Sequence, residues 1–451
     1  MSDKVKEIEH GPITTFIENK QFSEAAELLK EYHNVDIAHT IDRYEAEDIF
    51  QLLNEFPIDD QAEIFSYLPH NMQMDLADEL STKTLTAVLK NMSPDDRADF
   101  FNQLPEGRQE SLLPILAKAE RDDIRRLTSY EEGSTGAVMT SDYVTLSPAF
   151  TCREALAKLR EQAEDKETIY NSYVVDENRR VLGVISLHEI ILAPPYAKIE
   201  DLMGTNVISA YASDSKEETV RKIAKYDFLA IPVLDTENRL VGIVTYDDAM
   251  DVAEEAATED FHKGATIGKM VGRVRDASLF HLYKNRIVWL VLLVFGNIFS
   301  GAGIAFFEDV ISEHIALVFF LPLLIDSGGN AGSQSATLMV RALATGDVVM
   351  RDWARLIGRE VIIAFGLGLT MAIAVYGIGV YRGGFDVAMV ISLTMVVIVM
   401  VGSLIGMSLP FILSRLNLDP AAASAPLVTS MADISGVLIY FSLANFLLNI
   451  A

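Results

Sequence analysis

Residues 366–380 read GLGLTMAIAVYGIGV, and residues 391–407 read ISLTMVVIVMVGSLIGM. Neither stretch contains a charged residue, and about 20 apolar residues suffice for a helix to cross a bilayer. Five apolar segments of this kind follow one another in the chain: 287–307, 315–340, 356–381, 387–413 and 421–450. Their lengths predict a five-helix transmembrane domain over residues 277–451, so a lipid bilayer is the first partner that we expect.

The charge of the chain lies mostly outside these segments. Residues 277–451 contain 8 Lys and Arg against 10 Asp and Glu, so −25 of the formal net charge of −27 lies in residues 1–276. Such an acidic half excludes nucleic acid as a reasonable partner, because phosphate binding needs a basic surface, and it would concentrate cations instead. The single cysteine, Cys152, excludes an intramolecular disulfide and a cysteine-rich metal cluster.

The basic residues of the short loops predict the orientation. They gather on one side of the predicted segments: Lys284, Arg286, Arg341, Arg351, Arg355, Arg359 and Arg415. Arg382 lies on the other side. Because basic loops stay on the cytoplasmic side, we expect a multi-pass protein of the cell membrane with its acidic half and N-terminus in the cytoplasm and its C-terminus outside. The first twelve residues lack the apolar stretch of a cleavable signal peptide.

Polar residues interrupt two of the apolar segments. Asp433, in PLVTSMADISG, is the only charge of the last segment, and Thr429 precedes it by four residues. Residues 326–334, DSGGNAGSQ, contain Asp326 and Asn330. A carboxylate at bilayer depth is costly and usually marks an ion path. We therefore predict Asp433 as the pore ligand and the other three as pore lining; for Asp326 the alternative is a distorted helix packed tightly on a neighbour.

The chemistry of these side chains favours hard cations. Carboxylate, amide and hydroxyl oxygens suit Mg²⁺, Ca²⁺ or Mn²⁺ rather than Cu or Zn. Small residues that permit close helix packing recur in the same segments: Gly366, Gly368, Gly377, Gly379, Gly402 and Gly406. Five helices are few to enclose a permeation path, so we predict a homodimer with the pore on its two-fold axis.

Two internal repeats organise the acidic half. Residues 59–69, DDQAEIFSYLP, recur 36 residues later as DDRADFFNQLP at 95–105. A period of this length made of helix pairs predicts an all-α superhelical domain over residues 1–132. Residues 176–186, DENRRVLGVIS, recur 59 residues later as DTENRLVGIVT at 235–245, in an order that alternates strands and helices.

This second repeat resembles an α+β tandem pair of CBS domains, at 137–200 and 201–246. In CBS pairs that bind adenine nucleotides, the Thr and Asp of a T-x-x-D motif contact ribose. The resemblance points to Thr245 and Asp248 here, with Tyr170 stacked on the adenine and ATP as the candidate cofactor. The first copy departs from the motif with Ser186 and Glu189. The alternative is that Thr245 and Asp248 only cap the following helix.

The whole chain resembles the MgtE magnesium transporters. The match is most specific in PLLIDSGGNAGSQSATLMVRALATGD at 322–347 and PLVTSMADISGVLIYF at 426–441. The resemblance implies a homodimeric Mg²⁺ channel of magnesium homeostasis, with hydrated Mg²⁺ bound by Asp433. It also implies a connecting, or plug, helix and linker over residues 247–276, and cytoplasmic regulatory Mg²⁺ bound by the following residues: Asp95, Asp99, Asp214, Asp247, Asp248, Glu255 and Glu259.

Electrostatics supplies a mechanism for such a channel. Two subunits bring about −50 of formal charge together beneath the pore, which holds the acidic domains apart until Mg²⁺ bridges them and closes the path. The sequence does not distinguish Mg²⁺ from Mn²⁺ or Co²⁺ as further ions that the path carries. The alternative is a secondary-active divalent cation transporter coupled to Na⁺ or H⁺, although we find no duplication among the five segments. The sequence has no nucleophile–base constellation, so we do not expect an enzyme.

Overall fold

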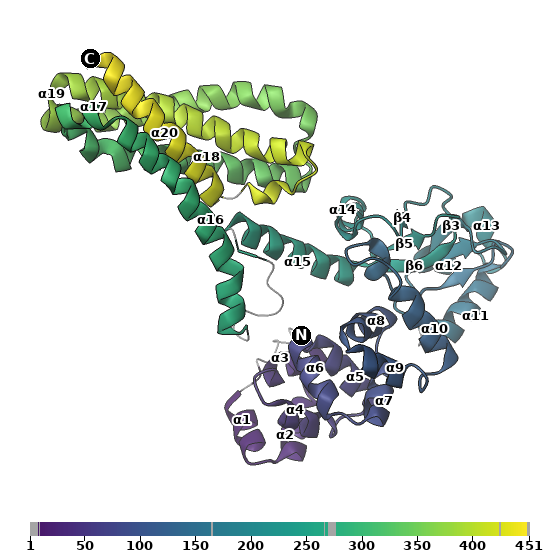
Figure 1. The fold of residues 1–451 in the computed structure, drawn as a ribbon. Coiled ribbons are helices and arrows are strands. Elements are labelled where there is room, and N and C mark those ends of the chain that lie inside the picture. Colours follow the sequence, from purple (N-terminus) through teal and green to yellow (C-terminus); the bar gives the residue numbers. More distant parts are fainter. Residues whose placement is uncertain are drawn as a thin grey trace. The chain divides into compact units, whose positions relative to one another are not determined.

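The computed structural model describes residues 8, 10–163, 166–265, 267–268, 277–423 and 425–448. The chain divides into two compact units, Met1–Ala256 and Ala257–Ala451. In the first unit a helical region precedes a mixed region of strands and helices, whereas the second unit is helical throughout its described residues (Figure 1).

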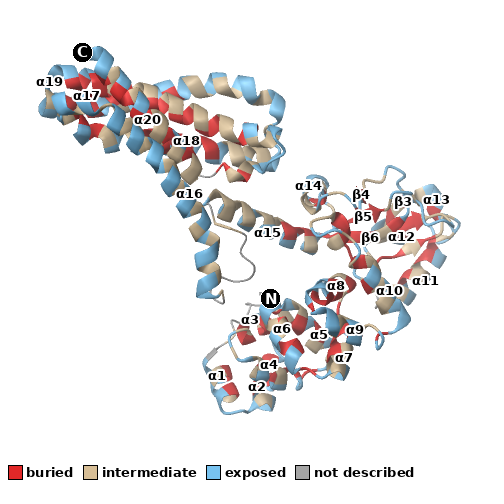
Figure 2. Ribbon diagram, in the orientation of Figure 1, coloured by how far each residue is buried: buried red, intermediate tan, exposed pale blue. Residues whose placement is uncertain are grey.

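Short helices form the N-terminal region of the first unit. They are α1 His10–Glu18, α2 Phe22–Leu29, α3 Asn34–Ile41, α4 Ala46–Leu53, α5 Ile58–Tyr67, α6 His70–Glu79, α7 Thr82–Asn91, α8 Pro94–Gln103, α9 Glu106–Leu112 and α10 Lys118–Leu127. Each buries a narrow apolar face in one shared core (Figure 2). The predicted period of 36 residues separates the first residues of α5 and α8 and their last residues. That these helices wind into a superhelix stays a prediction.

Two similar sheets follow the helices. The elements of the first copy are η1 Thr135–Ala137, β1 Thr145–Leu146, α11 Cys152–Gln162, β2 Asn171–Val175, β3 Val181–Ser186 and α12 Leu187–Leu192. Those of the second are α13 Ile199–Leu202, β4 Ala210–Tyr211, α14 Lys216–Tyr226, β5 Ala230–Leu234 and β6 Leu240–Thr245. Each sheet pairs its first two strands in parallel and its last two antiparallel. The last two strands of each copy keep the offset of 59 residues, as the repeat predicted.

Each copy is completed by a segment from the other. Thr140, just ahead of the first sheet, forms a β-bridge with Ile243 of the second sheet, and Val184 of the first sheet forms one with Gly204, just ahead of the second. The same exchange appears in the core, where a Cβ added to Gly242 would lie 2.5 Å from the sulfur of Met139. The glycine that both repeats contain, Gly183 in one copy and Gly242 in the other, is therefore needed so that the exchanged segment can approach the strand.

A long acidic helix, α15 Tyr246–Gly264, follows β6 directly and crosses the boundary between the two units. It occupies the first part of the connecting segment expected at 247–276. The linker expected up to residue 276 falls partly on residue 266 and residues 269–276, which lie outside the described part of the chain.

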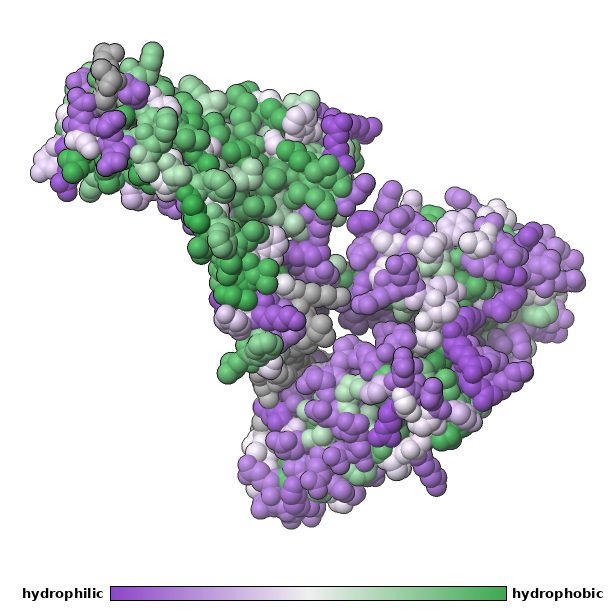
Figure 3. All heavy atoms as spheres, in the orientation of Figure 1, coloured by the Kyte–Doolittle hydropathy of each residue, from purple (hydrophilic) through white to green (hydrophobic). Residues whose placement is uncertain are grey.

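The second unit is built from long apolar helices, which give it a largely hydrophobic surface (Figure 3). They are α16 Leu279–Phe306, α18 Ala316–Thr345, α19 Trp353–Arg415 and α20 Ala425–Leu447, with the short elements α17 Glu308–Glu313, η3 Met350–Asp352 and η4 Pro420–Ala422 between them. By length and composition, four helices of the described chain could cross a membrane. The predicted fifth segment, 421–450, includes residues 424 and 449–450, which are not described.

The third and fourth predicted segments are the two arms of α19. The helix turns back at Gly384, whose φ of 81° and ψ of −178° are not helical and favour glycine. The arms then pack closely, since a Cβ on Gly368 would lie 2.8 Å from the Cα of Val396. The number of membrane crossings stays a prediction.

Candidate ion path and cytoplasmic cation sites

Glycines bring α18 into backbone contact with α19. A Cβ on Gly402 would lie 2.2 Å from the carbonyl oxygen of Gly328, and one on Gly406 would lie 1.9 Å from that of Gly332. Both pairs are spaced G-x-x-x-G, the spacing that lets two helices cross with their backbones touching. The stretch 326–334 is thus a continuous part of α18, and its glycines serve helix packing rather than interrupting the helix.

The polar residues of the same stretch lie on another face of α18, toward α20. Asn330 Nδ2 donates to Asp326 Oδ2 at 3.0 Å. Ser333 Oγ lies 3.2 Å from Thr429 Oγ1, and the Thr429 hydroxyl also lies 2.8 Å from the carbonyl oxygen of Ala425. Asp326 is near enough to Asp433 for the two carboxylates to repel each other. The structure therefore brings together the four pore residues that the sequence suggested.

This polar face is open in the single chain. Asp326 and Asn330 are exposed, and Thr429 and Asp433 are only partly buried. A carboxylate that faced lipid at bilayer depth would be strongly disfavoured, so the face needs a cover of protein or water. The most apolar window of α16 likewise has no residue buried inside the chain.

Glu360 is a membrane-domain carboxylate that the sequence analysis missed. Ser335 Oγ of α18 donates to Glu360 Oε1 of α19 at 2.5 Å, and Ser335 is buried. The signal was present, because residue 360 lies inside the predicted segment 356–381. Because the loop residues Arg355 and Arg359 come just before Glu360, its charge is also consistent with a position outside the membrane.

In the first unit, α8 and the start of α15 share an acidic cluster. Burial raises the pKa of Asp95 well above its usual range, and the neighbouring Asp248 raises it further. Burial also raises the pKa of Asp248 to about 7, partly opposed by the hydrogen bond from Thr245, and Asp247 and Glu167 add to the increase. Glu167, in the loop before β2, was not predicted, because only the tertiary fold brings it near these residues.

A cation would relieve this cluster. Asp95 Oδ1 is buried and has no hydrogen-bond partner among the described residues. Like-charged carboxylates in a poorly hydrated place are stabilised by a shared divalent ion. Even so, the described residues include no group of three or more His, Cys, Asp or Glu arranged to hold a metal directly. Any ion here would need water among its ligands or a small rearrangement of the carboxylates.

The other predicted regulatory residues lie at different places. Asp99 is close to Lys216 and Glu255, which form an ion pair at 2.6 Å. Asp247 is exposed beside Asp248. Asp214 is engaged within its own copy, by Lys222 at 3.1 Å and by the backbone N–H of Tyr211. In the second unit, Glu259 Oε1 lies 2.8 Å from Lys263 Nζ, which also lies 2.5 Å from Asp419 Oδ2.

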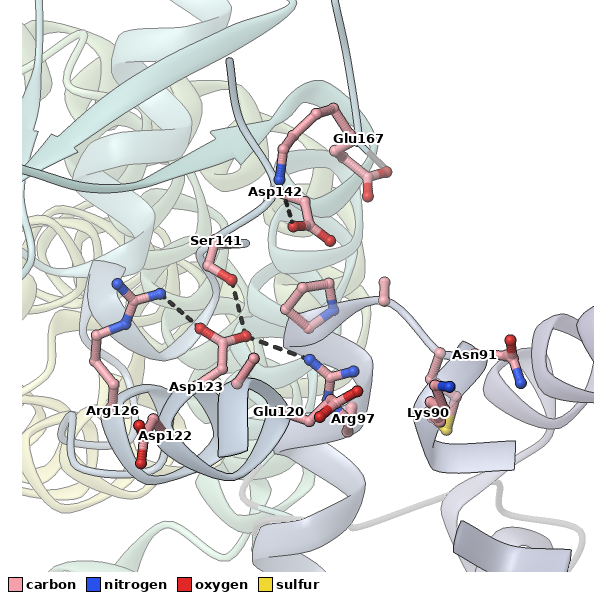
Figure 4. A pocket seen from close by; sticks show the side chains of 15 residues that line it. Lys90, Asn91, Arg97, Glu120, Asp122, Asp123, Arg126, Ser141, Asp142 and Glu167 are labelled. Carbon is pink, nitrogen blue, oxygen red and sulfur yellow. Dashed lines mark hydrogen bonds and ion pairs between the residues drawn. The ribbon is translucent and has the colours of Figure 1, made fainter. Parts of the chain in front are cut away.

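A network of ion pairs within the helical region is joined to the first copy of the strand repeat by a hydrogen bond from Ser141. Asp123 of α10 accepts hydrogen bonds from Arg97 at 3.3 Å, Arg126 at 2.6 Å and Ser141 at 2.8 Å (Figure 4). The network lies in a hollow of about 1120 Å³ that also contains Asp142 and Glu167. Because Arg97 is 6% exposed and belongs to α8, the network holds the helix that carries Asp95.

The suggested nucleotide residues are less closely assembled. Thr245 Oγ1 donates to Asp248 Oδ2 at 2.5 Å, the contact expected where a strand leads into a helix. Tyr170 is 64% exposed, so its ring is available for stacking. No contact between Tyr170 and Thr245 is seen among the described residues.

Comparison with known proteins covers both units. The "Divalent cation transporter" family model, MgtE, matches residues 321–443, the "MgtE intracellular N domain" matches 32–133, and the CBS domain matches 136–196 and 199–255. The magnesium transporter MgtE of Thermus thermophilus is 38% identical over 444 residues, 94% of either chain. That of Bacillus subtilis is 33% identical over 432 residues, 93% of this chain and 95% of the relative.

Solved structures match about half of this chain. The crystal structure of the soluble part of a magnesium transporter aligns with a TM-score of 0.51 and 32% identity over 55% of this chain and 98% of that one. The cytosolic domain of the Mg²⁺ channel MgtE in complex with ATP aligns with a TM-score of 0.52 and 33% identity over 54% of this chain and all of that one. Because relatives align along nearly the whole length and each region matches its family model in order, this chain belongs to the MgtE family of magnesium transporters.

Proposed function

We propose that the chain forms a homodimeric Mg²⁺-selective channel that imports Mg²⁺ across the cell membrane and closes when cytoplasmic Mg²⁺ is plentiful. The observation that carries this proposal is the polar face of α18 and α20, which combines two carboxylates with amide and hydroxyl oxygens in an otherwise apolar unit. The curated relatives are named magnesium transporters, which favours Mg²⁺ as the ion carried.

The ion path follows from the direction of the hydrogen bonds. The Thr429 hydroxyl uses its proton on Ala425, so its oxygen presents lone pairs to the path. The Asn330 amide steadies one oxygen of Asp326. Acceptor groups of this kind suit the outward-pointing protons of a hydrated Mg²⁺, which gives up its water reluctantly. Asp433 supplies the negative charge that holds the hydrated ion.

A second copy provides the cover that the polar face lacks. A two-fold axis beside α20 would place two copies of Asp433 across one path and remove four carboxylates from lipid. The unburied surface of α16 gives the same dimer further apolar area to pack.

Closure follows from the acidic half. Cytoplasmic Mg²⁺ would bind at Asp95 and Asp248, at Asp99 and Glu255, and near Asp214, Asp247 and Glu259. Because the compact arrangement would bind Mg²⁺ more tightly than the open one, binding would shift the population toward the compact arrangement. The connecting helix α15 ends at an ion pair between Lys263 and Asp419, beside α20, so a movement of α15 would act on the path.

Several further features belong to the proposal. The N-terminus is cytoplasmic and the C-terminus is outside, with domains at 1–132, 137–200, 201–246, 247–276 and 277–451. Tyr170, Thr245 and Asp248 bind an adenine nucleotide such as ATP; the relative solved with ATP supports this assignment.

The test is divalent flux into liposomes that contain the purified protein. We expect Mg²⁺ to enter down its own gradient, the Asp433→Ala variant to abolish entry, and the Asp386→Ala variant to retain it. Asp386 is a suitable control, since it is an exposed carboxylate beside the turn of α19. Entry that required an opposing Na⁺ or H⁺ gradient would favour the secondary-active alternative, and full flux in Asp433→Ala would refute the assigned ion site.

A further inference from the structure

Three arginines form a column at the start of α19. Arg355 and Arg359 lie four residues apart in the helix, and Arg351 lies four residues earlier in η3. The backbone passes from η3 into α19 through Asp352 in helical conformation, with φ of −82° and ψ of −10°. Residues spaced by four share one face of a helix, so the three guanidinium groups follow one another along one side. All three side chains are exposed.

This placement is electrostatically unfavourable within the chain alone. Like charges at i and i+4 repel each other, and the N-terminus of a helix carries partial positive charge, so cations belong at the other end. None of the three arginines makes an ion pair with another described residue. The nearest carboxylates in sequence are engaged elsewhere, Asp352 with the N–H of Val349 and Glu360 with Ser335.

The surroundings indicate which anion would balance the column. Exposed apolar side chains stand beside it, including Met350 at 41% and Trp353 at 40%, and the apolar arm of α19 begins immediately after it. Tryptophan and arginine are typical of the boundary between lipid and water, where aromatic rings and guanidinium groups meet the headgroups. A planar guanidinium binds a phosphate with two parallel hydrogen bonds.

We propose that Arg351, Arg355 and Arg359 form a binding site for the phosphate groups of anionic phospholipids. The site goes beyond the ion path and the cytoplasmic cation sites, and it does not depend on either. Arginines that serve only to orient the protein in the membrane would need to be on the correct side, not aligned on one face. The alignment is therefore the feature to test.

The experiment measures phosphatidylglycerol bound to the full-length protein by native mass spectrometry, with phosphatidylcholine as the neutral comparison. A surface arginine contributes about fivefold to binding of an anionic lipid, so we expect the R351Q/R355Q/R359Q variant to lose roughly 100-fold in apparent affinity. The matched control is Arg415→Gln, which removes one basic residue at the favourable C-terminal end of α19. It should lose no more than the roughly fivefold expected for one surface charge, against roughly 100-fold for the triple variant.

A second variant keeps the charge and the number of basic residues in the loop. In A354R/R355A the middle arginine moves about 100° around the helix and no longer lies between Arg351 and Arg359 on their shared face. We expect it to lose about fivefold, as Arg355→Gln does. Undiminished binding by A354R/R355A would overturn the proposal, because net charge alone would then suffice. Equal displacement of the lipid by free inorganic phosphate would overturn it as well. A triple variant that keeps its lipid but loses Mg²⁺-dependent closure would also overturn it, because the column would then interact with the acidic half of the protein.

Discussion

Replacing Gly402 with alanine should separate α18 from α19 at the place where the two helices touch. The added Cβ would lie 2.2 Å from the carbonyl oxygen of Gly328 and 2.9 Å from its carbon, which are backbone atoms that cannot rotate away. The helices must therefore move apart by about 1 Å, which forfeits a quarter to a half of the dispersion energy at the crossing. Overpacking of this kind lowers the free energy of unfolding by about 1–3 kcal/mol.

The matched control is Gly366→Ala on the first arm of the same helix, where the added Cβ meets nothing within 4 Å. Replacing a helical glycine with alanine stabilises the helix by about 0.5–1 kcal/mol in both variants. The difference between their free energies of unfolding therefore isolates the cost of overpacking. Both tryptophans, Trp289 and Trp353, belong to the second unit, so fluorescence during denaturant titration reports on that unit. We expect Gly402→Ala to unfold about 1–3 kcal/mol more easily than Gly366→Ala and to conduct less Mg²⁺. Equal unfolding free energies in the two variants would refute the close crossing.

Three further predictions concern the acidic half. Asp123→Ala should destabilise the first unit by about 3–5 kcal/mol, because it leaves a buried arginine without its carboxylate; the exposed Asp122→Ala is the control, and protease resistance is the measurement. Folded Asp248 keeps its proton up to about pH 7, whereas an ordinary aspartate loses it near 3.8, so without Mg²⁺ the stability should fall as pH rises between these values. Asp248→Asn should flatten that profile, and an unchanged slope would contradict the assignment. Neutralising Glu255 and Glu259 together should raise the Mg²⁺ concentration needed to close the path in liposome flux; unaltered inhibition would remove both from the gate.

The repeats and the apolar segments could be predicted from the sequence because each is a local pattern. The offset of 36 residues reappears in the bounds of α5 and α8, and the offset of 59 residues in the last two strands of each copy. The candidate pore residues could also be named from the sequence, because a carboxylate in an apolar helix has few explanations other than function; their role in a pore stays a prediction.

The partners of individual residues could not be predicted in the same way. Gly366 and Gly368 are two residues apart and so lie on nearly opposite sides of the helix, and only Gly368 meets a neighbour. The rotation that decides between them comes from packing along the whole of α19. Glu360 and Ser335 are 25 residues apart, and their hydrogen bond depends on the same rotation.

The exchange of segments between the two CBS copies bears on how such a pair can evolve. Met139 precedes the first sheet yet packs on Gly242 of the second, and Met203 precedes the second sheet yet packs on Gly183 of the first. A gene fragment that encoded one copy would lack the edge that its sheet requires and would leave a glycine-lined groove unfilled. Recombination should therefore transfer or delete the copies together, and inheritance as a pair follows from the path of the chain rather than from any ligand.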